Sequence, residues 1–231
     1  MRIVWLGHSG FRIEIEQAVL LIDPWLTGNP MFSADRRDEA LTGATHILLT
    51  HGHGDHAGDA AEIARDRDIP IACIHELSEW LGAQDRVRTM GFGKGGTLDL
   101  GGAAVTMVNA THSASVDFTS KGLIPAGSEA GFMVAGEGHT IYVSGDTDIM
   151  ADMGWMAEYH RPDIGILCAG GHYTMDMKRA AFAARKFFDF KTVIPCHYRT
   201  FPILAQSAEE LVAGLPGVEV IEPQVLEPIT I

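Results

Sequence analysis

The chain has 231 residues, of which 46% are hydrophobic and 20% are charged. This balance supports a large buried core and excludes disordered and fibrous proteins. Lys and Arg number 17 against 30 Asp and Glu, so the net charge is −13, which disfavours nucleic acid as a partner. No apolar run reaches the roughly 18 residues that cross a bilayer, and residues 1–8 lack the apolar stretch of a secretory signal. We expect a cytoplasmic protein without a membrane partner.

The first half of the chain changes from hairpins to alternating strands and helices. Short strands are predicted at 3–6, 11–15 and 18–22. Further on, strand patterns at 47–49 and 69–74 alternate with helical patterns at 57–67 and 76–81. Such alternation is typical of α/β proteins.

Hairpins return in the middle of the chain. One set is predicted over 86–90, 97–100 and 103–108, and a second hairpin over 131–134 and 140–143. Residues 164–168 and 193–196 are apolar at consecutive positions, which predicts strands buried on both faces and one sheet backed by another. A helix at 174–188 should cover a sheet. No linker or repeat divides the chain, so we predict one domain over residues 1–231 with a mobile stretch at 113–128.

The three cysteines lie inside apolar runs, which predicts reduced, buried thiols: Cys73, Cys168 and Cys196. Cys196 precedes a histidine, but neighbouring strand residues point to opposite faces, so a structural thiol is favoured. The glycine-rich segment 91–96 fits a dinucleotide pattern on paper. We reject it because it leads into a strand, whereas that fingerprint opens a helix.

The strongest chemical signal is the segment 50–56, Thr-His-Gly-His-Gly-Asp-His. Its three imidazoles and one carboxylate follow an apolar run directly, and burying so many titratable groups without a cation would be costly. Imidazole and carboxylate are good ligands for zinc and similar ions, and the two glycines permit a tight backbone path. A metal site is favoured over a solvated polar loop.

Ligand-type residues recur beyond three more predicted strands, at His112, Asp146 and His197. Sites in α/β sheets assemble at the carboxyl ends of strands. The expected ligand set is therefore His51, His53, Asp55, His56, His112, Asp146 and His197. Seven ligands exceed one tetrahedral ion, which predicts two divalent metal ions with Asp146 as their bridge. Zinc is the first expectation, and Mn, Fe, Co or Ni would also suit these ligands.

The pattern His51-x-His53-x-Asp55-His56, with a later His, Asp and His, resembles the metallo-β-lactamase superfamily. Four segments resemble its small bacterial metal-dependent hydrolases similar to L-ascorbate-6-phosphate lactonase: 6–11, 50–56, 144–147 and 195–198. The resemblance implies an α/β fold, an αββα sandwich of two mixed β-sheets with helices on the outer faces. It also implies that His51, His53 and His112 hold one metal, that Asp55, His56 and His197 hold the other, and that Asp146 is shared.

The same resemblance excludes several branches. Asp146 and His197 are 51 positions apart, which leaves no room for the inserted domain of the nucleases. Only 34 residues follow His197, too few for the helical domain of the thioester hydrolases. The redox-type di-iron members carry Glu where His53 stands, so oxygen reduction is disfavoured.

Three more residues are candidates for substrate binding. His8 lies in a loop that the resemblance places at the mouth of the site, although a surface turn is an equal alternative. His172 precedes a helix whose N–H groups favour an anion, and Tyr198 follows a ligand and could donate a hydrogen bond, although such a tyrosine more often packs. Asp55 and His172 are the candidate catalytic groups that help a metal-bound water to protonate the leaving group.

Two classes of function follow. The first is a metal-dependent hydrolase in which a hydroxide that bridges two metal ions cleaves an ester, lactone or phosphodiester-type bond of a small molecule. The alternative is a non-catalytic metal-containing module that senses or binds a small acidic ligand. A nuclease is weakened by the charge of −13. The physiological substrate, the metal and the oligomeric state stay open, a homo-oligomer included.

Overall fold

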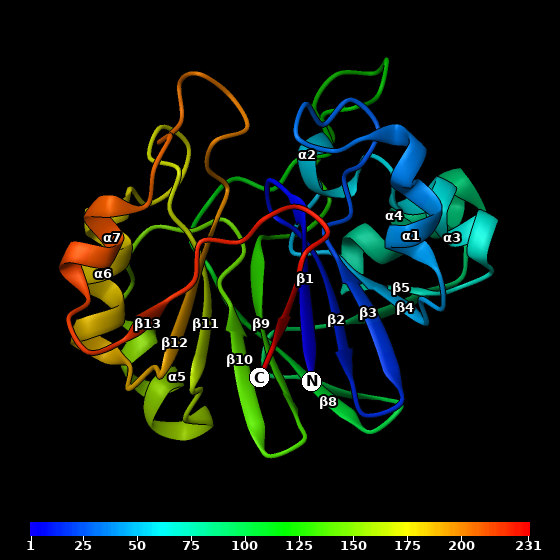
Figure 1. Cartoon of the computed structure of the whole chain (residues 1–231). Coiled ribbons are helices and arrows are strands. Elements are labelled where there is room, and N and C mark those ends of the chain that lie inside the picture. The colour runs from blue at the N-terminus through cyan, green and yellow to red at the C-terminus, as the bar shows by residue number, and fades with distance from the viewer.

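The computed structural model describes residues 1–231, and its strands form two mixed sheets of seven strands each. The first sheet has the order β14-β1-β2-β3-β4-β5-β6. Its strands are β1 (Arg2–Gly7), β2 (Gly10–Ile15), β3 (Ala18–Ile22), β4 (His46–Leu48), β5 (Ile71–Ile74), β6 (Thr89–Phe92) and β14 (Pro228–Thr230). Strand β14 pairs with β1, so the two ends of the chain lie side by side (Figure 1).

The second sheet has the order β13-β12-β11-β10-β9-β8-β7. Its strands are β7 (Thr97–Leu100), β8 (Ala103–Asn109), β9 (Ala130–Gly136), β10 (His139–Val143), β11 (Ile164–Cys168), β12 (Thr192–Cys196) and β13 (Glu219–Val220). Strands β10 to β13 are parallel neighbours, whereas β7 to β10 are antiparallel neighbours. One half of the sheet is therefore antiparallel, and the other half is joined by parallel crossover connections.

The helices lie on the outer sides of the two sheets (Figure 1). Beside the first sheet are the 3₁₀ helix η1 (Ala34–Arg36) and the helices α1 (Arg37–Leu41), α2 (Gly54–Ala57), α3 (Ala60–Arg67) and α4 (His75–Asp85). Beside the second sheet are α5 (Asp152–His160), α6 (Met177–Phe187) and α7 (Glu209–Gly214). The predicted αββα sandwich of two mixed sheets is confirmed. No helix has the length and apolar character needed to span a membrane.

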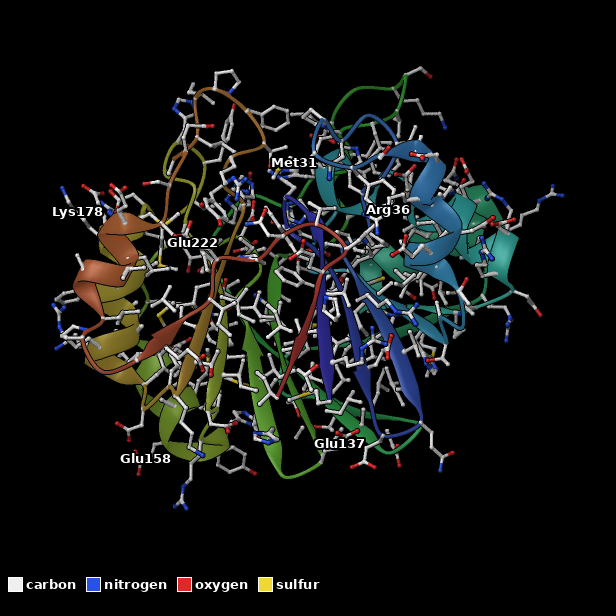
Figure 2. All side chains as sticks on the ribbon, in the orientation of Figure 1. Met31, Arg36, Glu137, Glu158, Lys178 and Glu222 are labelled. Atoms are coloured by element: carbon white, nitrogen blue, oxygen red, sulfur yellow. The ribbon has the colours of Figure 1, made fainter.

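One cluster of 67 buried residues forms the hydrophobic core. Every residue of β11 and β12 is buried, as their unbroken apolar runs predict. Side chains fill the space between the sheets, while charged residues such as Glu158 and Lys178 point outward (Figure 2). Helix α6 buries Met177, Ala180 and Ala184, the apolar face expected from their spacing. All three cysteines are free and buried.

The helix predicted over 57–67 is confirmed for the most part as α3 (Ala60–Arg67), and one predicted hairpin was wrong. The helix predicted over 57–67 is interrupted after α2, and the carboxylate of Asp59 there accepts hydrogen bonds at 2.6 Å from the backbone N–H groups of Leu26 and Thr27. Strand β6 pairs in parallel with β5 instead of joining a hairpin with β7. The glycine-rich turn at 93–96 carries the chain from one sheet to the other, so neighbours in sequence are not neighbours in a sheet.

The predicted mobile stretch 113–128 contains internal hydrogen bonds. Val116 and Ile124 exchange two backbone hydrogen bonds of 2.9 Å, and the side chain of Val116 is fully buried. These contacts hold the stretch against the core at Val116. Its mobility stays a prediction.

The pairing directions bring the carboxyl ends of several strands to one edge. In the first sheet β1, β3 and β4 run in the same direction, and in the second sheet β8, β10 and β12 do so. The residues that follow these strands therefore meet at the same edge of the sandwich. Close packing holds them there, because a Cβ atom added to Gly170 would lie 1.8 Å from the carbonyl oxygen of His197.

We predict that Gly170→Ala lowers the free energy of unfolding by about 1–3 kcal/mol or more, because the backbone beside His197 must move to admit the methyl group. Gly93→Ala is the matched control, since an added Cβ there meets no atom within 4 Å. Its effect should stay within about 0.5 kcal/mol. Urea unfolding followed by circular dichroism measures both, and an unchanged midpoint for Gly170→Ala would contradict the close approach.

Candidate metal centre

The structure brings all seven predicted ligands to one edge of the sandwich. His51 and His53 follow β4, Asp55 and His56 lie in α2, and His112 follows β8. Asp146 and His197 follow β10 and β12. Their ligand atoms fall into overlapping groups in which all atoms lie within 4.8 Å of one another. The strand-end rule therefore predicts a real spatial cluster.

The first group consists of His51, His53 and His112. Nε2 of His51 lies 2.9 Å from Nδ1 of His53, and the rings of His53 and His112 have centroids 5.2 Å apart. His51 is 1% exposed, whereas the other two are half-buried and face the cleft described below. Nitrogen atoms crowded in this way repel one another unless a proton or a cation lies between them.

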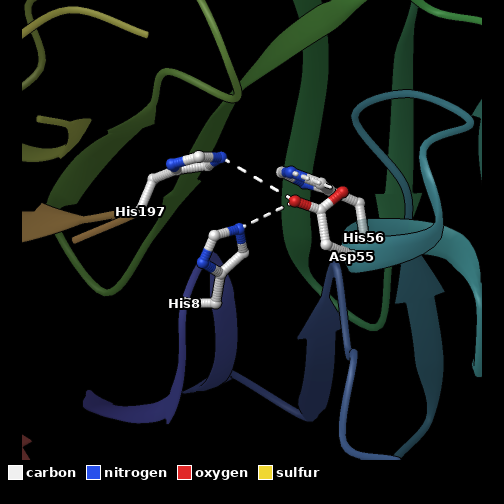
Figure 3. A group of neighbouring side chains, drawn as sticks. All are labelled: His8, Asp55, His56 and His197. Atoms are coloured by element: carbon white, nitrogen blue, oxygen red, sulfur yellow. Dashed lines mark hydrogen bonds and ion pairs between the residues drawn. The ribbon is translucent and has the colours of Figure 1, made fainter. Parts of the chain in front are cut away.

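The second group consists of Asp55, His56 and His197, together with His8 (Figure 3). Oδ1 of Asp55 lies 4.0 Å from Nε2 of His56, and Oδ2 lies 3.9 Å from Nε2 of His197. The side chain of Asp55 is 31% exposed, while the histidines are buried. The group thus combines three imidazoles with one carboxylate that solvent can reach.

Asp146 lies between the two groups. Its Oδ2 atom is 3.1 Å from Nε2 of His197, 3.4 Å from Nε2 of His56 and 3.6 Å from Nε2 of His112. Its side chain is 2% exposed, so these imidazoles are its main surroundings. One carboxylate thus contacts ligand candidates of both groups.

Several polar atoms at the centre have no hydrogen-bond partner although they are buried. They are Nε2 of His56, Oδ1 of Asp146 and Nδ1 of His197. Leaving such atoms unpaired is costly, and imidazole nitrogens and carboxylate oxygens are the donors that zinc-like ions prefer. The residues therefore fit divalent metal ions.

Asp23, directly after β3, orients two of the histidines. Its carboxylate accepts hydrogen bonds from the backbone N–H of Thr50 at 2.8 Å, the hydroxyl of Thr50 at 2.6 Å and Nδ1 of His56 at 2.7 Å. Because the Thr50 hydroxyl donates to Asp23, it accepts from Nδ1 of His51, 2.9 Å away. In their neutral forms both imidazoles therefore carry the proton on Nδ1 and direct the lone pair of Nε2 to the centre, as metal-bound histidines do.

Sequence reasoning missed Asp23. The signal was present, because Asp23 follows the buried run 18–22 just as the ligands follow their strands. Its side chain is only 1% exposed, and its φ angle of 44° turns the chain sharply at the strand end.

Burial and neighbouring charges set the protonation states. Burial, followed by the charge of His56, holds the pKa of His51 well below its usual range, and burial also lowers the pKa of His112. Burial alone would lower the pKa of His56, but three carboxylates, Asp146 first among them, outweigh it and raise that pKa. Burial would raise the pKa of Asp55, yet His56 and other imidazoles lower it. These carboxylates favour a positive charge at the centre.

His8 does not line the cleft as a substrate contact. Its side chain is fully buried, with Nε2 2.9 Å from Oδ2 of Asp55 and Nδ1 2.9 Å from the hydroxyl of Thr200 (Figure 3). Burial and then His197 lower the pKa of His8 to about 4. The structure corrects the prediction, because the ring lies beneath Asp55 and contacts a ligand candidate rather than open space.

Tyr198 is also corrected. Its side chain is fully buried and stacks on Trp5 with ring centroids 5.7 Å apart. Beyond the end of β12, His197 has a φ angle of 57° and lines the cleft, while Tyr198 packs into the core. Its hydroxyl cannot reach a substrate in this conformation.

His172 lies outside the metal cleft. It is exposed and lines a neighbouring cavity of about 380 Å³ together with Asp148 and Arg179. Its ring meets that of Tyr173 edge to face, with centroids 4.6 Å apart. Tyr173 lines both cavities, whereas His172 lines only the outer one. This position does not support a role for His172 in proton transfer at the metals.

The two ligand groups open on a cleft of about 500 Å³. Its lining consists of Trp25, His53, Gly54, Asp55, His112, Ser113, Asp117, Asp146, Tyr173, His197 and Phe201. Gly54 donates its N–H to Oδ1 of Asp117 at 2.7 Å, which ties the stretch 113–128 to α2. The cleft can admit a small molecule beside the candidate ligands.

Comparisons with known proteins agree with this geometry. A beta-lactamase superfamily domain matches residues 19–198. The chain is 71% identical over 231 residues to a UPF0173 metal-dependent hydrolase of Cereibacter sphaeroides, with 100% of both chains covered. It is 70% identical over 229 residues to one of Paracoccus denitrificans, with 99% of both covered. The solved structure of Igni18, a metallo hydrolase of Ignicoccus hospitalis, has 31% identity and a TM-score of 0.83, and the match covers 100% of this chain and 98% of that one.

The sandwich, the histidine-rich edge and these matches define a protein of the metallo-β-lactamase superfamily. Within it, the chain belongs to the UPF0173 family of metal-dependent hydrolases. The resemblance to the superfamily is thereby confirmed. The comparison with L-ascorbate-6-phosphate lactonase stays a prediction.

We predict that Asp23→Ala lowers the free energy of unfolding by about 2–4 kcal/mol. The change leaves buried donors of Thr50 and His56 without an acceptor, and each such group costs about 1–3 kcal/mol. Asp99→Ala is the control, because exposed Asp99 accepts only one hydrogen bond, from the N–H of Gly102. Its loss should cost less than about 1 kcal/mol. Chemical denaturation of both metal-free variants tests this, and equal costs would argue against the role assigned to Asp23.

Proposed function

We propose that the chain is a hydrolase with two divalent metal ions, zinc by first expectation, that cleaves an ester, lactone or phosphodiester-type bond in a small molecule. The first group, His51, His53 and His112, would hold one ion. Asp55, His56 and His197 would hold the other, with Asp146 shared. The observation that carries this proposal is the position of Oδ2 of Asp146, within 3.6 Å of imidazole nitrogens from both groups.

Divalent ions bound there would make water nucleophilic near neutral pH and polarise the oxygen of the substrate under attack. The residues of the chain supply orientation. Asp23 holds His56, and Thr50 holds His51, so that the unprotonated Nε2 atoms face the centre. The cleft excludes bulk water from one side, since the buried Asp146 and His197 form its floor.

His8 is assigned a positioning role. Nε2 of His8 forms a hydrogen bond with Oδ2 of Asp55, so that Oδ1 of Asp55 is free to face His56. Ligands held by a partner in this way keep one orientation. The lowered pKa of Asp55 makes it a poor proton donor, so we assign it a ligand role rather than that of a general acid. The cytoplasmic location, the lack of nucleic-acid and membrane partners and the oligomeric state stay predictions.

The number of metal ions can be counted directly. We expect about two zinc ions per chain for the wild type after loading and desalting. We expect about one for His112→Ala and for His197→Ala, because each variant lacks one ligand of one metal ion. His160→Ala is the control, because His160 ends α5 on the outer side of the second sheet. Plasma mass spectrometry gives the ratios. One ion per wild-type chain, or two in both ligand variants, would contradict the dinuclear arrangement.

Catalysis is tested by a screen of esters, lactones and phosphodiesters with metal-loaded protein. We expect His53→Ala and Asp146→Ala to lower kcat/KM for any accepted substrate by at least about 10³-fold, because each change removes charge stabilisation that acts in the transition state. His160→Ala should keep the wild-type value. Full activity in either ligand variant would remove the mechanism. Tight binding of a small acid without turnover of any class would favour a sensor instead.

A further inference from the structure

The apolar part of the cleft is entirely aromatic. Its three apolar lining residues are Trp25, which follows β3, Tyr173, which lies between β11 and α6, and Phe201, which follows β12. The rings of Trp25 and Phe201 have centroids 6.0 Å apart, and both side chains are half-buried. Tyr173 is 57% exposed. Loops of both sheets therefore supply flat ring surfaces around the metal ligands, and no aliphatic side chain joins them.

The same lining contains no Lys or Arg. Its charged groups are the carboxylates of Asp55, Asp117 and Asp146, of which only Asp117 is not a candidate metal ligand. In the neighbouring cavity Arg179 is bound to both oxygens of Asp148, at 2.8 and 2.9 Å. The guanidinium of Arg199 lies over the buried ring of Tyr198, 5.8 Å from its centroid.

A substrate that carries a phosphate or carboxylate away from its reacting bond would therefore meet no side-chain cation in the cleft. It would instead meet Asp117 and the field of a chain with a net charge of −13. The metals supply the local positive charge, and their ligand carboxylates already offset part of it. A neutral molecule avoids this repulsion and can place a flat group against the aromatic rings.

We propose that the substrate is an uncharged ester or lactone that carries an aryl or similarly flat unsaturated group next to the reacting carbonyl. This inference rests on the proposed function. In the reaction, water adds to the carbonyl, the acyl C–O bond breaks, and a carboxylic acid and an alcohol are released, joined in one molecule for a lactone. The flat group packs against the ring surfaces of Trp25 and Phe201 that face the cleft, while the carbonyl lies over the ligand groups.

Matched esters test the proposal on the metal-loaded protein. Ethyl phenylacetate and ethyl cyclohexylacetate have the same reacting bond and similar size, but only the first carries a π-system. We expect kcat/KM to be roughly tenfold higher for the phenyl ester, since each aromatic contact contributes about 2–10-fold. A phosphate group at the para position of the phenyl ring should lower kcat/KM by at least about tenfold.

The preference should depend on the two rings. Trp25→Leu and Phe201→Leu should each reduce the ratio of kcat/KM for the phenyl ester to that for the cyclohexyl ester to about threefold or less. Phe182→Leu is the matched control, because this phenylalanine of α6 is 45% exposed and lies outside the cleft. It should leave the ratio unchanged.

The outcomes separate this inference from the proposed function. Equal kcat/KM for the two esters, or a higher value for the phosphorylated ester, would overturn the substrate class while leaving the hydrolase intact. Turnover of phosphodiesters alone would also overturn the substrate class, whereas absence of turnover for every ester, lactone and phosphodiester would overturn the hydrolytic function. In that case, titration calorimetry measures the affinities of phenylacetate and cyclohexylacetate and tests the aromatic preference without catalysis. Equal affinities would overturn it, and tighter binding of phenylacetate that Trp25→Leu abolishes would support it.

Discussion

The contact on which the whole centre depends is that of one buried carboxylate with imidazoles from both halves of the sandwich. Asp146 follows a strand of the second sheet, yet its Oδ2 atom lies 3.4 Å from His56, which belongs to the helix after β4 in the first sheet. Its other close neighbour is His197, at 3.1 Å. The geometry exists only if both sheets keep their relative register. The core of 67 buried residues thus positions the site as much as the ligands do.

Around this contact lies a layer of polar groups that decides which nitrogen atoms face the centre. Asp23 and Thr50 accept hydrogen bonds from Nδ1 of His56 and His51, and Thr200 and Asp55 hold the ring of His8 through its two nitrogen atoms. Every residue of this polar layer is buried or partly buried, so folding removes water from these groups at a cost in free energy. Bound cations offset that cost, which explains why an otherwise apolar sandwich concentrates so many titratable groups at one edge.

Much of this centre could be predicted from the sequence because its ligands follow strands whose apolar runs are plain. His112, Asp146 and His197 are far apart in the chain, but parallel strands bring their carboxyl ends to one edge. Tertiary facts were beyond such reasoning. After β12 the chain turns so that His197 lines the cleft and Tyr198 is buried, and the sequence alone does not show which of the two faces the cleft. The burial of His8 also depends on packing between distant segments. Likewise, the partner of β6 is set by the turn at 93–96, where the chain changes sheets.

Charge links the metal ligands to the choice of substrate. A site that binds a phosphorylated molecule usually adds Arg or Lys at a distance from the reacting bond, because the guanidinium fork or the ammonium recognises the oxygens. Here Arg179, which lines the neighbouring cavity, is already paired with both oxygens of Asp148, and Asp117 presents a carboxylate in the lining of the cleft. Positive charge is thus confined to the position of the metals. The remainder of the cleft offers rings, and rings select molecules by shape and polarisability rather than by charge.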